Sequence, residues 1–447
     1  MDYKELYAKT PVPKAVISLV IPTVISQLIT VVYNMADTYF VGQLGDPVQV
    51  AAATVAMPPF IFLTGIANLF GIGGASLISR CMGVKDLERA HHGSAFSFWM
   101  AGIVAFLYGL LFMIARPVIL PLMGVTEETY VYTYEYVVFT VTLGAIPTVL
   151  NTVLAHFIRT EGKAKQASYG LMFGGILNMI LDPVFIFGFD LKIKGAAIAT
   201  LVSNIIALMY FLFIIYKGRK QTVLSLKPKD ISFSTGIPAE ILLVGLPSFI
   251  MTFMSFFSNT TLNRLMSNFS STAIAGMGIA KKADMVGFAL AQGMTQGVLA
   301  LIGYNYATGD HKRMGDVIKT TTIYSCSLAA IGSVGLYIFA TPVAKLFIQE
   351  PETVVYGARF IRTLCLTLPA SSVTMMIITV FQATGEKRRP MFLSLLRKGG
   401  LDVPFMFLFF YTVGLFGIPW ATPIADILTM TCSALLFYPY WKKLVKH

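Results

Sequence analysis

Charged residues are scarce in this chain. Only 13% of its 447 residues are Asp, Glu, Lys or Arg, whereas 56% are hydrophobic. Soluble domains carry about 25% charged residues, so this composition argues against a soluble enzyme, a disordered chain and a disulfide scaffold. It is typical of a polytopic membrane protein. At about 20 apolar residues for each spanning helix, the chain has room for twelve helices with loops between them.

Cysteine and histidine are also few. The four Cys are scattered without a CxxC pair, and the five His are too sparse for a zinc site. The sequence contains no Walker A, HExxH, GxSxG or aspartate-rich prenyl-binding motif. We therefore expect neither a cofactor nor an enzymatic activity.

The basic residues predict membrane topology. The net charge is +12, but the basic residues are spread over short loops between apolar runs, and nucleic-acid binding requires them clustered on one face. With the N-terminus placed inside, 25 of the 34 Lys and Arg residues fall on the inner side. The positive-inside rule then predicts a multi-pass protein of the cell membrane with both termini in the cytoplasm. The first apolar run is interpreted as a retained helix and not a signal peptide, because acids precede it, it is longer than the apolar region of a signal peptide, and it has no clear cleavage site.

Twelve segments are predicted to span the membrane as helices. Their apolarity on all sides and the absence of alternating segments favour helices over a β-barrel. They are residues 15–36, 47–79, 90–115, 136–158, 166–189, 195–216, 241–263, 285–309, 320–344, 363–385, 390–413 and 417–440.

The two halves of the chain repeat each other. A nearly constant shift of one half along the other places Pro22 on Pro247, Asn34 on Asn259, Asp86 on Asp310, Pro147 on Pro369 and Thr200 on Thr422. Six helices in each half make the repeats parallel, a design used by alternating-access transporters with a cavity between two bundles. We predict an N-lobe over 1–216, a cytoplasmic linker over 217–239 and a C-lobe over 240–447.

Two acids within predicted spans are the strongest candidates for function, because a charge inside a membrane is costly. Asp37 lies near the end of the first helix, and its counterpart in the repeat is Leu262. Asp182 shares a helical face with Asn178, four residues earlier, and Pro183 frees a backbone carbonyl nearby. With Thr200 on the next helix, these residues offer hard oxygen ligands to a small cation. A proton, Na⁺ or a cationic substrate could each neutralise them; an interfacial Asp37 and a self-satisfied Asn–Asp pair are the structural alternatives.

The second half offers weaker candidates. Lys398 and Asp402 are four residues apart and are expected to pair, Arg397 is expected to reach the inner surface, and Asp426 lies in the twelfth helix. Met side chains adapt to varied ligands. The substrate cavity is therefore predicted to include Asn34, Met251, Met254, Phe256, Asn259 and Asp402.

The motifs together resemble one transporter family. NMADTYFVGQLG in the first helix, ISRCMGVKD after the second, ILNMILDPVFIFGF in the fifth and GAAIAT opening the sixth are similar to the bacterial branch of the multidrug and toxic compound extrusion (MATE) family. The resemblance covers essentially the whole chain. It implies a V-shaped pair of lobes and export of organic, often cationic, xenobiotics by exchange with Na⁺ or H⁺. It assigns the cation site to Asp37, Asn178, Asp182 and Thr200, and the lack of an acid on the seventh helix puts a second, C-lobe site in doubt.

Two other functions remain open at this point. A flippase for a lipid-linked or other amphiphilic metabolite belongs to the same superfamily, although such proteins usually have more spans and an Arg-rich cavity. A membrane lipid transferase would need a clustered catalytic constellation. The favoured prediction is an antiporter of the cell membrane that acts as a monomer, contacts membrane lipid and uses Na⁺ or H⁺ as the coupling ion.

Overall fold

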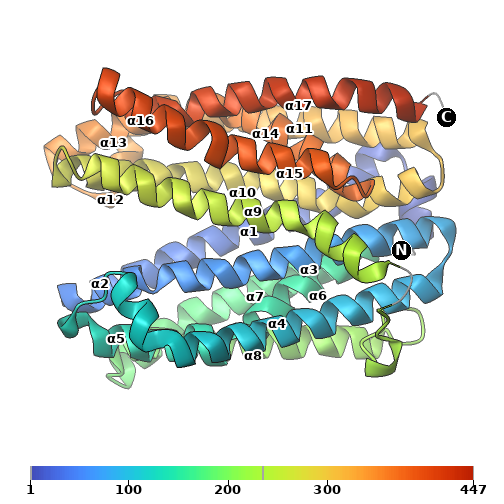
Figure 1. The fold of residues 1–447 in the computed structure, drawn as a ribbon, viewed down its shortest axis with the longest axis horizontal. Coiled ribbons are helices and arrows are strands. Elements are labelled where there is room, and N and C mark those ends of the chain that lie inside the picture. The colour runs from blue at the N-terminus through green and yellow to red at the C-terminus, as the bar shows by residue number, and fades with distance from the viewer. Residues whose placement is uncertain (1–2, 234–235, 446–447) are drawn as a thin grey trace. The chain divides into compact units, whose positions relative to one another are not determined.

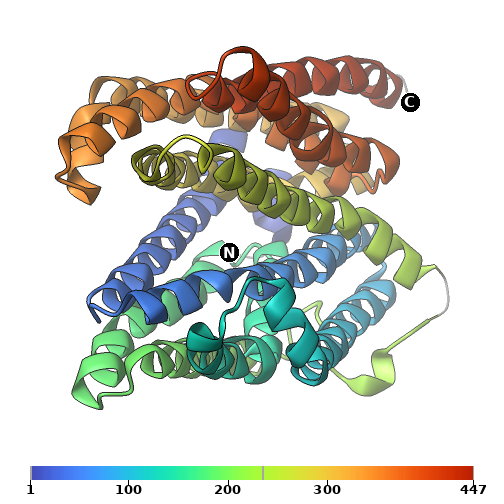
Figure 2. The same ribbon diagram turned by 60° about the vertical axis from the view of Figure 1, so that its left-hand side comes forward.

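The chain is built from helices. The structure, a computed structural model, describes residues 3–233 and 236–445, and these contain no β-strand (Figures 1 and 2). The helices of the first half, in chain order, are η1 (Glu5–Lys9), α1 (Val12–Gly42), α2 (Pro47–Val55), α3 (Met57–Val84), α4 (Leu87–Leu122), α5 (Glu127–Val137), η2 (Val138–Leu143), α6 (Ala145–Thr160), α7 (Ala164–Pro183), η3 (Val184–Gly188) and α8 (Lys192–Lys217).

The second half follows after a linker that contains the short turn η4 (Pro228–Asp230). Its helices are α9 (Ile237–Met266), α10 (Ser271–Ala307), α11 (His311–Ile338), α12 (Ala340–Phe347), α13 (Pro351–Leu364), η5 (Cys365–Thr367), α14 (Leu368–Ala383), α15 (Arg388–Leu395), η6 (Leu396–Asp402), α16 (Val403–Thr412), η7 (Ile418–Trp420) and α17 (Ala421–Val445).

The membrane spans agree with the prediction of a polytopic all-α protein. Among the described residues, ten helices are long and apolar enough to cross a membrane, and Glu127–Leu143 with Ala145–Thr160, bent by 46°, makes an eleventh. The remaining predicted span is α15, η6 and α16, which run without interruption from Arg388 to Thr412. Arg397, Lys398 and Asp402 lower its apolarity, and all three have ion-pair partners. The twelve predicted helices are thereby accounted for.

Two compact units share these helices. Unit 1 contains Leu28–Thr252, and unit 2 contains Lys4–Gln27 together with the chain from Phe253 onward. These units differ from the predicted lobes at two helices, because α1 and α9 each contribute one part to each unit. Within unit 2, Gln27 Nε2 donates a hydrogen bond to Gln296 Oε1 at 3.0 Å. Within unit 1, the Glu240 carboxylate of α9 pairs with Arg80 and Arg89 of the first half.

Helix boundaries reproduce the internal repeat. Asp86 and Asp310, which the repeat makes equivalent, cap α4 and α11 by accepting hydrogen bonds from the backbone N–H groups of Arg89 and Arg313, at 3.0 and 2.9 Å. The shift that places Asp86 on Asp310 also places both ends of the segment Ala164–Gly188 on the ends of the segment Arg388–Thr412. Equivalent positions in the two halves can therefore be compared directly.

The N-terminus of α8, which carries Thr200, is anchored by α2. The Gln49 Oε1 atom accepts a hydrogen bond from the backbone N–H of Ile193 at 3.1 Å. Gln49 also donates to Asp46, which caps α2 by accepting from the N–H of Val48. These hydrogen bonds from Gln49 and Val48 lower the pKa of the Asp46 carboxyl.

Candidate functional site

The fifth and sixth predicted spans bring three of the predicted residues together. Asn178 Nδ2 on α7 lies 3.2 Å from Asp182 Oδ1, one helical turn away, and 3.3 Å from Thr200 Oγ1 on α8. Asp182 is fully buried and Asn178 nearly so. Thr200 lies within α8, not at its start. The amide of Asn178 thus connects a carboxylate and a hydroxyl inside unit 1.

Asp37 belongs to the same unit and is buried. It is 9% exposed, and α1 continues beyond it to Gly42, so it does not lie at the end of the helix. Tyr136, which is 6% exposed, lies close to it. The charges of Asp37 and Asp182 interact, which places both acids of the prediction in one electrostatic environment.

Tyrosines are the residues that sequence reasoning missed. Tyr136 and Tyr33 each lie near enough to Asp37 and Asp182 to interact with their charges. Tyrosine is a hydrophobic residue by composition, so its presence in an apolar segment does not by itself indicate a polar role for its hydroxyl. The usable signal was spacing, because Tyr33 precedes Asp37 by four residues and so shares its helical face.

A glycine allows α1 to approach α7 at the site. A Cβ atom on Gly175 would lie 2.8 Å from Tyr33 Cδ1, so any larger residue would push the two helices apart. Gly175 precedes Asn178 by one turn. The close approach therefore positions the part of α1 that carries Asp37 against the helix that carries Asp182.

Three buried oxygen atoms in this group have no hydrogen-bond partner among the residues that the structure describes. They are Asp37 Oδ1, Asn178 Oδ1 and Asp182 Oδ2. In addition, Pro183 has no N–H, which removes the helical hydrogen bond to the carbonyl of Met179. Buried polar atoms are nearly always paired, and oxygen atoms of this kind are the ligands that a small hard cation prefers. The residues present therefore fit a cation or a proton.

The residues predicted to line a substrate cavity lie on α1, α9 and η6. Asn34 donates to the backbone oxygen of Thr30 on its own helix at 2.8 Å. Met251, Met254 and Phe256 are half-buried, and Asn259 is exposed. No contact among these side chains tests the predicted cavity, which stays a prediction.

Asp402 lies in a different setting. It has no exposed surface, and its carboxylate binds Lys398 Nζ at 3.0 Å, Ser258 Oγ at 2.7 Å and Thr422 Oγ1 at 2.9 Å. The predicted pairing of Lys398 with Asp402 is confirmed. With no exposed surface, the carboxylate cannot contact a substrate in this structure.

The prediction that Arg397 reaches the inner surface is wrong. Arg397 is 4% exposed, and its Nε lies 2.7 Å from Asp426 Oδ1 while Nη2 lies 2.9 Å from Ser371 Oγ. Asp426, which the sequence left without a role, is the partner that makes this burial possible.

The sequence model of the MatE family matches this chain twice, at residues 22–184 and 247–408. The chain belongs to the MatE family. The two matched segments also correspond to the two halves of the internal repeat. Members of this family are transporters rather than enzymes, so the chain is a multi-pass membrane transporter.

Relatives in the MatE family are similar over their whole length. The multidrug export protein MepA of Staphylococcus saprophyticus is 30% identical over 442 residues, which are 98% of this chain and 96% of that protein. MepA of Staphylococcus aureus strain N315 is 30% identical over 445 residues, with the same coverage. The crystal structure of MATE in complex with MaL6 superimposes with a TM-score of 0.93 at 25% identity, covering 100% of this chain and 99% of that one.

Proposed function

We propose that this MatE protein is a multidrug antiporter that exports organic, often cationic, compounds in exchange for Na⁺ or H⁺. The observation that carries the proposal is the buried acid pair of unit 1. Asp37 and Asp182 each have one carboxylate oxygen without a hydrogen-bond partner among the described residues, and Asn178 connects Asp182 to Thr200.

Charge balance explains why such a site exchanges ions. Two carboxylates that share a low-dielectric environment cannot both stay ionised without a cation or a proton. No Lys or Arg forms an ion pair of 4.0 Å or shorter with either acid in the part of the chain that the structure describes. The neutralising charge must therefore come from solution, which makes its occupancy sensitive to the ion gradient across the membrane.

The substrate class follows from the relatives and from the same charge balance. The similar proteins are named multidrug export proteins. An organic cation that binds near the acid pair disfavours the inorganic cation, and linkage requires the reverse effect to be equal. Competition of this kind is sufficient for exchange when the protein alternates between two open sides.

Transport in proteoliposomes tests the proposal. We expect an imposed Na⁺ or H⁺ gradient to drive the cationic dye across the membrane in the direction opposite to the ion. Each gradient is applied separately to identify the coupling ion. Asp182→Asn protein, reconstituted in equal amount, should show no gradient-driven uptake. Dye movement that ignores both gradients contradicts the proposal, and movement of a lipid-linked saccharide without dye movement supports a flippase instead.

We further propose that both termini are cytoplasmic, on the basis of the positive-inside distribution. The test uses single cysteines after replacement of the four native ones. In the linker, Gln221 is exposed, whereas Ser225 is buried and bonded to Asp230, so one cysteine replaces Gln221. The other replaces exposed Ser267, which is predicted to lie on the outer side of the membrane. An impermeant maleimide added to intact cells should label position 267 alone. Labelling at 221 would reverse the orientation.

A further inference from the structure

Unit 2 contains a modified version of the unit 1 site. Gly399 is the counterpart of Gly175 in the repeat. A Cβ atom on Gly399 would lie 2.9 Å from the sulfur of Met254 on α9. This is nearly as close as the contact between Gly175 and Tyr33 in unit 1. In the same alignment of the two halves, Asn178 corresponds to Asp402. Thr422, the counterpart of Thr200, bonds to Asp402 at 2.9 Å, as Asn178 bonds to Thr200.

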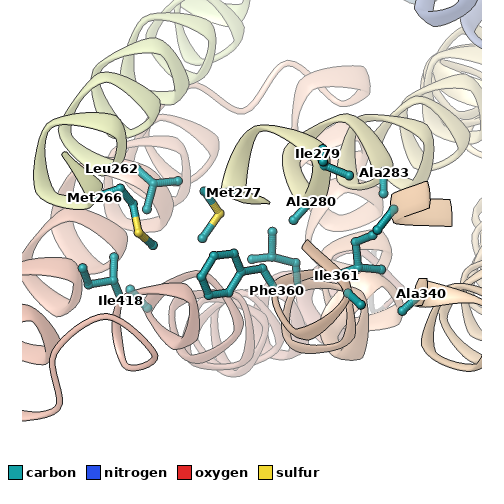
Figure 3. Close-up of a cluster of buried hydrophobic side chains, with 14 of the residues drawn as sticks. Leu262, Met266, Met277, Ile279, Ala280, Ala283, Ala340, Phe360, Ile361 and Ile418 are labelled. Atoms are coloured by element: carbon teal, nitrogen blue, oxygen red, sulfur yellow. The ribbon is translucent and has the colours of Figure 1, made fainter. Parts of the chain in front are cut away.

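The two unpartnered acids of unit 1 have apolar counterparts in unit 2. In the repeat, Asp37 corresponds to Leu262 and Asp182 to Met406. Leu262 and Met406 are 2% and 0% exposed and belong to one apolar cluster, part of which is drawn in Figure 3. In unit 2, buried apolar side chains therefore occupy the positions at which unit 1 has the two carboxylates that need a cation.

The carboxylate at the unit 2 site, Asp402, is paired with a lysine of the same chain. Lys398 Nζ lies 3.0 Å from Asp402 Oδ2, and Ser258 and Thr422 donate to the same carboxylate. Lys398 is 13% exposed and Asp402 is not exposed at all. Within the described part of the chain, the unit 1 site thus has two carboxylates and no paired ammonium, whereas the unit 2 site has one carboxylate paired with one ammonium.

We propose that the Lys398 ammonium is a built-in substitute for the coupling ion, so that the unit 2 site is a latent monovalent-cation site that the chain itself keeps loaded. The ligands of that latent site are the Asp402 carboxylate and the hydroxyl oxygens of Ser258 and Thr422. These are hard oxygen ligands of the kind found in unit 1. Resting on the proposed function, the inference restricts ion exchange to unit 1.

A second lysine defines the control that this proposal needs. Lys281 of α10 interacts electrostatically with Lys398, Asp284, Asp402 and Asp426. No ion pair of 4.0 Å or shorter joins it to a carboxylate among the described residues. If Lys398 alone substitutes for the ion, removal of Lys281 should not open the site.

The experiment looks for a gain of Na⁺ binding when Lys398 is removed. The full chain carries Asp37→Asn and Asp182→Asn, so that unit 1 is silent. Its thermal unfolding is then measured in NaCl and in choline chloride at equal ionic strength and pH. Adding Lys398→Ala should produce a Na⁺-dependent rise in Tm of about 2 °C or more, because an ion that binds only the folded state stabilises it. The silent parent should show no such rise.

Three further variants make the result specific. Lys398→Arg keeps a cation, Lys281→Met keeps Lys398, and Lys398→Ala with Asp402→Asn removes the ligand; none should respond to Na⁺. A response in any of them equal to that of Lys398→Ala overturns the proposal. So does the absence of a response in folded Lys398→Ala protein and in its combination with Lys281→Met.

Poor folding of the variant is also informative. If Lys398→Ala protein is recovered folded from NaCl but not from choline chloride, a free ion has replaced the ammonium and the proposal is supported. Recovery from neither salt overturns it. All of these measurements are made with unit 1 silenced, so they can fail while gradient-driven transport by the wild type succeeds, and the reverse.

Discussion

The two units place equivalent helices around sites that differ in charge balance. In unit 1, α1 and α7 carry Asp37 and Asp182 with unpartnered oxygens, while the equivalent positions in unit 2 carry buried Leu262 and Met406. A buried site that lacks a countercharge must take one from solution, whereas a site that is already neutral need not. The difference shows how a duplicated six-helix unit can keep its frame and confine ion exchange to one copy.

A second pair of equivalent positions, Asn204 and Asp426, shows the same pattern. In unit 1, Asn204 Nδ2 donates to Thr148 Oγ1 at 3.3 Å, an uncharged contact between α8 and α6. In unit 2, Asp426 accepts from Ser371 between α17 and α14, with Arg397 completing a neutral pair. Unit 2 therefore contains more charge than unit 1 at these positions, but each of these charges is balanced within the protein.

Neutralising the acids should have the largest effect. Asp182→Asn and Asp37→Asn each remove a charged ligand, whose contact contributes about 1.5–3 kcal/mol. We expect cation affinity to fall about 10- to 100-fold and dye efflux from cells to fall to background, with normal expression. The equivalent unit 2 changes, Met406→Leu and Leu262→Met, conserve volume and should leave efflux near wild type. Loss of efflux in both sets would remove the functional difference between the units.

Breaking a balanced pair in unit 2 should affect stability. Arg397→Met leaves the Asp426 charge buried without a countercharge, at a cost of about 3–5 kcal/mol, and should lower Tm markedly. Adding Asp426→Leu removes that charge and should restore much of the loss. The uncharged equivalent in unit 1, Asn204→Ala, should cost only about 1 kcal/mol. Thermal unfolding of the four proteins measures the contrast, and equal losses in Arg397→Met and Asn204→Ala would contradict it.

The smallest expected effect lies just after the C-terminal ends of α3 and α10. Lys85 has φ of +63° and its equivalent Gly309 has φ of +76°, in the left-handed region that costs a residue with a Cβ about 1–2 kcal/mol. Lys85→Gly should therefore stabilise the protein by about 1 kcal/mol, and Gly309→Ala should destabilise it by a similar amount. No atom lies within 4 Å of a Cβ at Gly309, so only the backbone term is measured. Shifts of the same sign would show that the two ends are not equivalent.

The sequence was sufficient to predict what depends on local spacing. The four-residue separation of Asn178 and Asp182 predicted a shared face, and the repeat that aligns Asp86 with Asp310 predicted equivalent positions in the two halves. Partners distant in sequence were not predictable. The close approach of Tyr33 to Gly175 and the pair of Arg397 with Asp426 depend on which helices pack together. The division of α1 and α9 between units has the same origin, because an apolar helix carries no local signal for its neighbour.

Equilibrium dye binding to purified protein tests the central claim most directly. The dye is titrated at several Na⁺ concentrations and pH values, with ionic strength held constant to remove screening effects. If the acid pair of unit 1 is where cations and drug compete, raising Na⁺ or lowering pH weakens dye binding to the wild type, and Asp182→Asn abolishes that dependence. Dye affinity that is indifferent to both ions in the wild type, or an ion dependence that survives in Asp182→Asn, would contradict the account.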